Sequence, residues 1–300
     1  MRVLIATDGS PEATTAVRTA GRLLGKEENE FVILCVAPEF SGRKADEASN
    51  RVRSTYEQRM TRETESILNR AQHTLAAQGI SAGTEARFGS PAKTILEING
   101  DFDVTVVGAT GKRDISTVGI GPVASRVLEH GSGTILVARD LIGDNTWRVL
   151  LAVDGSRSSM QALRAMINYF KSSSLDVTFM HVVETPWVSF GSDDESFDVT
   201  ADGVFDEIDP ELHLKQEMER EADSILDDAE KELADYVLGS NRVIREGNPG
   251  TVILGEAEVG DYDLVVLGST GMSGLKHQML GSVSAKIAAQ APCSVAVVKS

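Results

Sequence analysis

Short apolar runs alternate along the chain with longer stretches in which apolar and charged residues follow a helical period. The runs are rich in Val, Ile and Leu and have the length of buried strands, as in RVLIA from Arg2, FVILCVA from Phe31 and YDLVVL from Tyr262. Long amphipathic helices with a heavily charged face are predicted over Thr55–Gln78 and Leu214–Val237. This alternation indicates βαβ units and a mostly parallel sheet covered on both sides.

The whole pattern occurs twice. The segment RVLIATDGSPEATTAVRTA from Arg2 matches RVLLAVDGSRSSMQALRAM from Arg148, 146 positions later. Four more segments match in the same order: FVILCVA and VTFMHVVE, RFGSPAKTIL and REGNPGTVIL, DFDVTVVGATG and DYDLVVLGSTG, and GTILVAR and CSVAVVK. Such a long-period repeat indicates two copies of one domain. We place them at residues 1–139 and 147–300, joined by the short polar linker Asp140–Thr146.

Composition narrows the class of protein. The 300 residues suit two domains, and 41% hydrophobic with 25% charged residues is ordinary for a globular protein. The net charge of -16 disfavours nucleic acid and anionic membrane as partners. No apolar run approaches the roughly 20 residues of a membrane helix, and Met1 leads straight into a strand without a signal peptide. We therefore expect a cytoplasmic protein, with Cys35 and Cys293 as buried small hydrophobes.

A stretch rich in Gly and Ser, GSTGMSGLKHQMLGSVS over Gly268–Ser284, lies between a predicted strand and a predicted helix. The first turn of a helix presents unpaired N–H groups and the positive end of a dipole, which together favour an anion. Glycines let the backbone approach a phosphate closely, and Ser282 and Ser284 add hydroxyl donors. The alternative is that the glycines only form a turn and that Ser282 only caps the helix.

Known phosphate loops do not describe this stretch. The chain has no Walker A sequence, and the dinucleotide fingerprint needs three glycines at the first strand–helix turn, where this chain has DGS. The spacing from Gly268 to Ser282, G-x2-G-x9-G-S, instead resembles the G-2x-G-9x-G-[S/T] ATP-binding motif of the universal stress protein family. LLAVDGS, HVVE and REGNPGTVIL also resemble segments of that family in order, so the chain looks like a tandem member.

The resemblance implies two tandem Rossmann-like domains of the adenine nucleotide α-hydrolase type, each a five-stranded parallel sheet with helices on both faces. It implies that adenine lies near the ends of strands one and two and the triphosphate across the Gly-rich loop. The implied ATP-binding residues of the second repeat are Ala152, Asp154, Val182, Gly268, Gly271, Gly281, Ser282 and Val283. For Asp154 a second reading stays open, because an Asp in DGS often caps the turn that follows.

The first repeat departs from the motif at one position. Its corresponding residues are Ala6, Asp8, Val36, Gly108, Gly111 and Gly121. The glycine spacing is kept, but Pro122 stands where the motif has Ser or Thr. Proline is comfortable at the first position of a helix, yet it has neither an N–H nor a hydroxyl to donate. We expect this repeat to bind ATP weakly or not at all.

The second repeat is longer by 14 residues between Asp154 and Gly268 than the first between Asp8 and Gly108. The excess lies in Ser189–Glu211, which has nine carboxylates and no Lys or Arg. We favour a flexible acidic loop. A lid over the adenine end is the alternative, in which nearby carboxylates help to hold a divalent cation.

The resulting hypothesis is a regulatory or stress-response protein that binds ATP, with Mg²⁺ or another divalent cation, and changes its partners or conformation. A slow ATP-hydrolysing enzyme and a ligand-free scaffold are the alternatives. No nucleophile–base pair is evident, and His181, inside a strand, is expected in the core. The family commonly dimerises through its last strands, so TILVA and SVAVV are expected to pair within the chain as an internal pseudo-dimer. An unknown protein partner and a homodimer of whole chains are further expectations.

Overall fold

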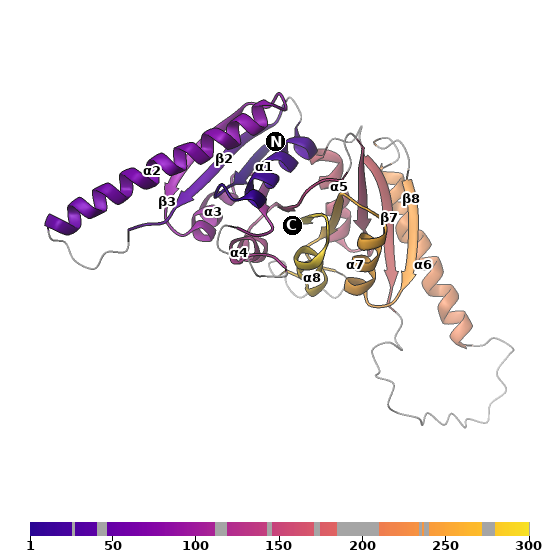
Figure 1. Cartoon of the computed structure of the whole chain (residues 1–300). Coiled ribbons are helices and arrows are strands. Elements are labelled where there is room, and N and C mark those ends of the chain that lie inside the picture. The colour runs from indigo at the N-terminus through magenta and orange to yellow at the C-terminus, as the bar shows by residue number, and fades with distance from the viewer. Residues whose placement is uncertain are drawn as a thin grey trace, which may run out of the picture.

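The computed structural model describes residues 1–25, 28–40, 47–111, 119–142, 146–170, 175–184, 210–233, 236, 240–271 and 280–299, with backbone alone at 47–50 and 210–212. Two repeats follow the same order of elements (Figure 1). The first contains β1 (Arg2–Ala6), α1 (Pro11–Leu24), β2 (Glu30–Ala37), α2 (Glu47–Ala76), β3 (Ala82–Phe88), α3 (Pro91–Asn99), β4 (Val104–Gly108), α4 (Pro122–His130) and β5 (Thr134–Ala138). The second contains β6 (Trp147–Ala152), α5 (Arg157–Tyr169), β7 (Leu175–Val183), α6 (Pro210–Leu233), β8 (Ser240–Glu246), α7 (Pro249–Val259), β9 (Leu264–Gly268), α8 (Ser282–Gln290) and β10 (Ser294–Val298).

The strands form one ten-stranded sheet in the order β3-β2-β1-β4-β5-β10-β9-β6-β7-β8. Within each repeat all neighbours are parallel, which confirms the predicted five-stranded parallel sheet. The strand order reverses between β1 and β4 and again between β6 and β9. β5 and β10 pair antiparallel, with Val137 opposite Val295 and Thr134 opposite Val298. This ladder, called the seam below, confirms the predicted pairing of the last strands within the chain.

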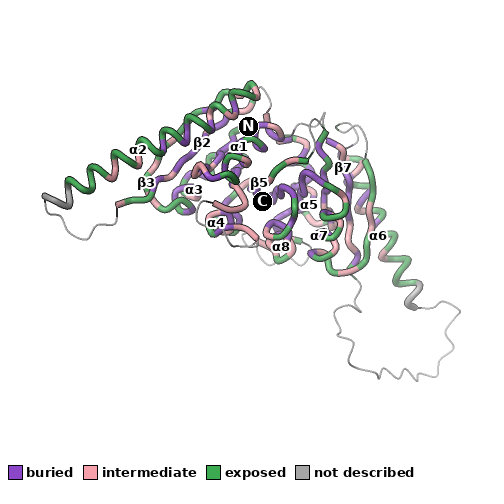
Figure 2. Tube along the Cα trace, viewed as in Figure 1, coloured by how far each residue is buried: buried purple, intermediate pink, exposed green. Residues whose placement is uncertain are grey.

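Helices cover both faces of the sheet. Side chains of α1, α2, α5 and α6 share one apolar cluster with the sheet, while those of α3, α4, α7 and α8 share the other. Figure 2 shows buried strands between helices whose outer surfaces are exposed. Every residue of β5 and β10 is buried. Burial on both faces is the reason why the strands read as continuous apolar runs rather than as alternating ones. Both cysteines are buried as expected.

One aspartate in each repeat fastens the start of the first strand. Asp103 Oδ2 accepts a hydrogen bond of 2.7 Å from Arg2 N, and Asp263 Oδ2 accepts one of 3.0 Å from Arg148 N. Asp263 Oδ1 also accepts from Ile142 N in the linker, at 2.7 Å. The second Asp of the matched segments DFD and DYD therefore has a structural role that the repeat alone did not reveal.

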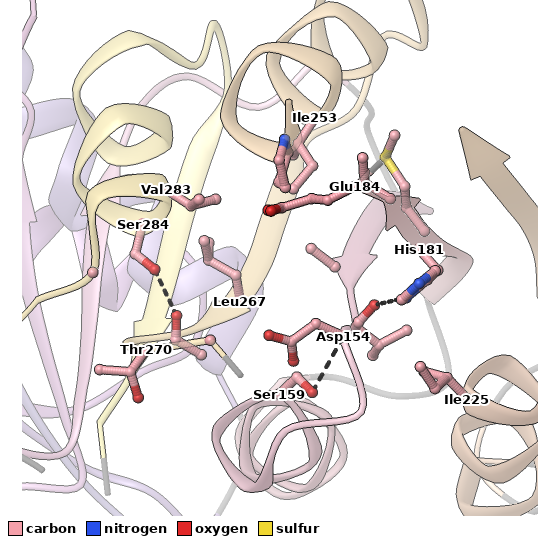
Figure 3. Close-up of a pocket in the computed structure, with 18 of the residues that line it drawn as sticks. Asp154, Ser159, His181, Glu184, Ile225, Ile253, Leu267, Thr270, Val283 and Ser284 are labelled. Carbon is pink, nitrogen blue, oxygen red and sulfur yellow. Dashed lines mark hydrogen bonds between the residues drawn. The ribbon is translucent and has the colours of Figure 1, made fainter. Parts of the chain in front are cut away.

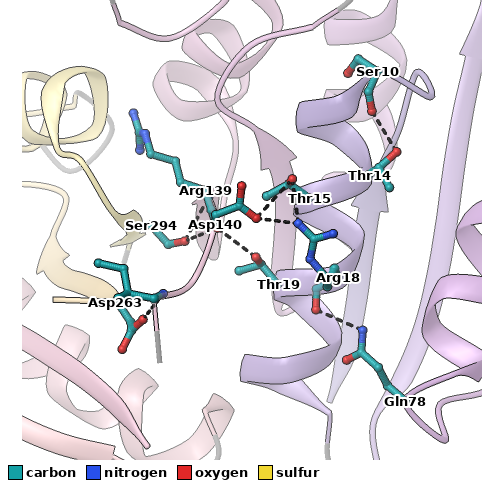
Figure 4. A network of polar contacts seen from close by, with 11 residues as sticks. Ser10, Thr14, Thr15, Arg18, Thr19, Gln78, Arg139, Asp140, Asp263 and Ser294 are labelled. Carbon is teal, nitrogen blue, oxygen red and sulfur yellow. Dashed lines mark hydrogen bonds and ion pairs between the residues drawn. The ribbon is translucent and has the colours of Figure 1, made fainter. Parts of the chain in front are cut away.

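The linker is held at its first residues by the first repeat. Thr19 Oγ1 of α1 donates to Arg139 O at 2.9 Å, and Arg18 Nη2 donates to Asp140 Oδ1 at 2.5 Å (Figure 4). The Arg18–Asp140 pair is exposed, so it contributes little to stability. The contact of Thr19 with Arg139 O is partly buried and fixes the end of β5 against α1 just before the linker.

The two long helices begin earlier than expected. α2 starts at Glu47 instead of Thr55, and α6 at Pro210 instead of Leu214. The predicted helix starts were placed where the apolar periodicity begins. That periodicity arises only in the part of a helix that packs on the sheet. The preceding turns of α2 are exposed wherever their side chains are described, and they form from residues of good helix propensity such as Arg and Glu (Figure 2). None of the described helices combines the length and the apolar character needed to cross a bilayer.

Lys299 follows β10 and reaches across the seam. Its backbone N donates to Gly133 O at 3.1 Å, and its Nζ donates to Glu129 O, near the end of α4, at 2.9 Å. Burial lowers the pKa of Lys299 from an ordinary 10.5 to about 8, against the opposing attraction of Glu129. The folded state therefore releases this proton at a lower pH than the unfolded state does.

We predict that wild-type protein gains stability relative to Lys299→Met as the pH rises from about 8 to about 10.5. Between these pH values Lys299 is protonated in the unfolded state and neutral in the folded state, so raising the pH favours folding. Below pH 8 the lysine is protonated in both states, and the full cost of burying the ammonium remains. Melting temperatures of both proteins across this range measure the difference. A difference that stays constant with pH would contradict the prediction.

Candidate functional site

A pocket of about 640 Å³ lies in the second repeat, beyond the carboxyl ends of β6, β7 and β9 (Figure 3). Its volume is in the range typical of small-molecule sites. Its position at the reversal of strand order is where open α/β sheets bind ligands. All eight residues predicted for ATP in this repeat line it: Ala152, Asp154, Val182, Gly268, Gly271, Gly281, Ser282 and Val283. The structure thus brings together positions that span more than a hundred residues of sequence.

Asp154 organises the turn after β6. Its Oδ1 accepts a hydrogen bond of 3.0 Å from Ser156 N, and Ser156 Oγ accepts one of 3.1 Å from Ser159 N as the N-cap of α5. The first repeat repeats this turn, with Ser10 N donating to Asp8 Oδ1 at 2.9 Å. The turn-capping role of both aspartates is therefore confirmed. The Asp154 carboxylate also faces the pocket, so this role is compatible with contact to a ligand (Figure 3).

Two glycines of the Gly-rich stretch approach other residues closely, and at Gly268 the neighbour is backbone. A Cβ on Gly268 would lie 2.5 Å from Ser158 Oγ and 2.6 Å from the backbone carbon of the same residue. A Cβ on Gly271 would lie 2.8 Å from Asp154 Oδ2. In the first repeat, Gly111 approaches Asp8 Oδ2 in the same way, at 3.0 Å. A Cβ on Gly108 would lie 3.1 Å from the backbone carbon of Glu12, so packing favours the first glycine of the motif in both repeats.

The N-terminal end of α8 completes one wall of the pocket. Gly281 is the N-cap, and its N donates to Ser269 O at 2.7 Å. Ser282 is the first helical residue and is exposed, so the reading in which Ser282 only caps the helix is wrong. The N–H groups of Ser282, Val283 and Ser284 belong to the first turn, where no helical carbonyl precedes them as acceptor. They are the donors available to an anion.

Ser284 does not act as the hydroxyl donor that the sequence suggested. Its Oγ is buried and donates to Gly268 O at 2.7 Å. At the third position of α8 the side chain faces the end of β9 rather than the open pocket (Figure 3). The hydroxyl proton is thereby committed to the protein, and Ser282 is left as the candidate hydroxyl donor.

The equivalent elements of the first repeat have the same backbone geometry. Gly121 is the N-cap of α4, and its N donates to Ala109 O at 2.7 Å, the same contact that Gly281 makes. Ala6 and Val36 pack on the same apolar cluster as Ala152 and Val182 do. Pro122 occupies the first helical position, as expected. The two repeats therefore share the fold at this position, and they differ in the hydrogen-bond donors that Pro122 lacks and Ser282 has.

Sequence reasoning missed several residues of the pocket. His181 was expected in the core but lines the pocket, with its Nδ1 2.9 Å from Val153 O. Because a carbonyl only accepts, Nδ1 carries a proton and the ring orientation is fixed. Met218, Glu221 and Ile225 of α6 form another wall. Their spacing along one helical face was visible in the sequence, but it did not reveal what that face would meet.

Acidic side chains line part of the pocket. Glu184 at the end of β7 and Glu221 of α6 line it together with Asp154. In the part of the chain that the structure describes, no group of three or more His, Cys, Asp or Glu side chains could hold a metal ion. The acidic insert Ser189–Glu211, for which we expected a loop or a lid, lies outside the described residues except for the start of α6.

These observations define the chain as a tandem, doubly wound α/β protein with a pocket at the strand-order reversal of its second repeat. The model of the universal stress protein family matches residues 1–139 and 146–299. The chain belongs to the universal stress protein family, and the resemblance stated from its motifs is confirmed.

The chain resembles known proteins that match its full length and others that match about half of it. A universal stress protein of Mycolicibacterium smegmatis is 25% identical over 99% of this chain and 96% of its own length. The universal stress protein YxiE of Bacillus subtilis is 32% identical over 51% of this chain and 98% of its own length. The crystal structure of a universal stress protein from Archaeoglobus fulgidus covers 99% of this chain and 98% of its own, with a TM-score of 0.65 and 19% identity. This last likeness concerns the fold alone.

We predict that Gly268→Ala destabilises the protein by about 1–3 kcal/mol, the usual range for overpacking. The added methyl would collide with Ser158 of α5, including its backbone. Gly255→Ala is the matched control, because Gly255 is an exposed position inside α7 where a Cβ meets nothing within 4 Å. That change should stabilise by about 0.5–1 kcal/mol. Urea unfolding measures both, and a Gly268→Ala variant as stable as wild type would contradict the packing argument.

Proposed function

We propose that the second repeat binds ATP in this pocket and that the protein acts in stress response or regulation through nucleotide-dependent conformation or partner binding. One observation supports this most: the eight motif positions line a single pocket at the strand-order reversal. They come from β6, β7, β9, the loops that follow β6 and β9, and the start of α8. In this proposal the adenine lies near Ala152 and Val182, where Ile225 and Ile253 make the lining apolar.

The phosphates would extend toward the N-terminal end of α8. There, the backbone N–H groups of Ser282 and Val283 and the Ser282 hydroxyl would donate to phosphate oxygens. Asp154 would contact the nucleoside while it keeps its bond to Ser156. Packing leaves no room for a Cβ at Gly268, and Gly271 lies close to the Asp154 carboxylate, so these glycines would shape the loop under the phosphates.

We infer that a divalent cation enters with the phosphates. A helix N-terminus offers about half an elementary charge, which is small against a triphosphate beside Asp154, Glu184 and Glu221. Mg²⁺ in proteins commonly keeps waters and binds one or two carboxylates plus the phosphates of the ligand. The absence of a metal cluster among the described side chains is compatible with that mode.

A ligand-free scaffold is the second candidate, because close packing against the backbone of Ser158 already accounts for Gly268. Ser282 distinguishes the two candidates. It is exposed at the first position of α8 and does not cap the helix, so packing gives no reason for its identity.

We predict that Ser282→Pro weakens ATP binding about tenfold to thousandfold, because it removes an N–H and a hydroxyl that each donate to a charged group. The fold should be unaffected, since α4 begins with Pro122 in the same geometry. Ser282→Ala keeps the N–H and should lose less. Isothermal titration with ATP and Mg²⁺ measures the affinities, and melting temperatures check the fold.

Chromatography of the nucleotide released by denatured wild-type protein tests the proposal directly. About one ATP or ADP per chain, reduced in Ser282→Pro, is the result expected. Pro122→Ser is the reciprocal variant and should raise the affinity of the first repeat. Binding to wild type that Ser282→Pro leaves unchanged would place the nucleotide elsewhere, and no binding at all would favour the scaffold.

A further inference from the structure

Each repeat ends in a basic residue that crosses the seam. Arg139 follows β5, and Lys299 occupies the equivalent place after β10. Arg139 contacts the C-terminal end of α8, and Lys299 contacts the C-terminal end of α4. These are the helices whose N-terminal ends lie at the Gly-rich stretches of the two repeats. The last strand of one repeat thus supports the phosphate-side helix of the other.

The contacts of Arg139 are directed at backbone groups of the second repeat. Its Nη2 donates to Ala288 O at 2.8 Å, and its Nη1 donates to Cys293 O at 3.1 Å. Its backbone N donates to Ser294 Oγ at 3.0 Å, and the same hydroxyl donates back to Arg139 O at 3.1 Å (Figure 4). Burial lowers the pKa of the guanidinium, which nevertheless stays charged at neutral pH. A fixed cation is thereby held at the end of α8.

α8 has no cation of its own at this end. Its nine residues contain no basic residue in the last turn, and its carbonyls after Ile287, which accepts from Ala291 N, have no helical donor. The negative end of a helix dipole is stabilised by a cation, just as the positive end is stabilised by an anion. Arg139 supplies the cation from the other repeat. The backbone of Gly119, in the Gly-rich stretch of the first repeat, also lies near Ala289 O at this end.

At its opposite end α8 is tied to the pocket. Ser284 Oγ donates to Gly268 O, and Gly281 N donates to Ser269 O, each at 2.7 Å. A short helix held at both ends presents its first-turn N–H groups in a fixed position. If either attachment were lost, these N–H groups would no longer be aligned in advance. The free energy of binding a phosphate would then include the cost of aligning them.

We propose that Arg139 of the first repeat is a positioning residue for the nucleotide site of the second, holding α8 so that its N-terminal donors meet the phosphates. The inference rests on the proposed function. It gives the first repeat a role that needs no nucleotide of its own: the second site is fully formed only when the seam is in place.

Arg139→Met in the full chain is the principal test, with Lys299→Met as the matched control on α4. ATP affinity with Mg²⁺ should fall about three- to thirtyfold in Arg139→Met, the range expected for a partly buried charge at a helix end. Lys299→Met should leave it unchanged. Arg139→Lys keeps the charge and should recover most of the affinity.

Adenosine separates positioning from general loosening of the fold. It has no phosphate for α8 to contact, so its affinity should be the same in wild type and Arg139→Met. An equal loss for ATP and adenosine, an equal loss in Lys299→Met, or an unchanged ATP affinity in Arg139→Met would overturn the proposal.

Hydrogen exchange without nucleotide keeps this test separate from the proposed function. Amides of α8 should exchange faster in Arg139→Met than in Lys299→Met, and those of α4 should show the reverse. If wild type binds no ATP, the proposed function fails while the exchange result still decides whether Arg139 holds α8. Equal exchange of α8 in both variants would overturn the positioning role.

Discussion

The antiparallel pairing of β5 with β10 is the interaction on which the rest of the structure depends. Both strands are buried at every residue, and each would otherwise end its repeat as an open, apolar edge. Duplication within one chain supplies the missing neighbour at high effective concentration. The ladder satisfies the backbone groups of both edges and merges two five-stranded sheets into one of ten strands. The outer edges, β3 and β8, instead carry ion pairs such as Arg87–Glu85 and Arg242–Asp227.

The seam also brings α4 and α8, the helices that begin at the Gly-rich stretches, into contact with the other repeat. In each repeat the last strand follows the helix that begins at the Gly-rich stretch, so pairing of the last strands places α4 and α8 within reach of the other repeat. Arg139 and Lys299 use this proximity to bond the ends of those helices. The same approach would not be available to a single repeat. An internal pseudo-dimer therefore differs from two independent domains joined by a linker.

The two repeats keep the same backbone contact where each Gly-rich stretch meets its helix, but they differ in chemistry at the next residue. Gly121 and Gly281 make the same hydrogen bond to a carbonyl of the preceding strand end. The next residue is Pro122 in one repeat and Ser282 in the other. Folding tolerates this change because a helix does not use the N–H of its first residue. A phosphate would use it, so a substitution that is silent for stability alters the capacity for an anionic ligand.

The family resemblance implied the pairing of the last strands, whereas the sequence pattern by itself determined the repeat, the parallel sheets and the location of the Gly-rich stretch. These follow from patterns along the chain: apolar runs record burial, and repeated segments record duplication. Local pattern also explains the limits, since the first turns of α2 and α6 carried no apolar period and were missed.

Only the tertiary structure decided how particular side chains are used. His181 faces the pocket, Ser284 donates to Gly268 O, and Arg139 reaches a helix end 149 positions away. Hydrogen bonds of this kind depend on distances of about 3 Å between groups far apart in sequence. Residue type and spacing indicate which groups are able to bond, whereas the packing of helices across the sheet selects the partners that meet.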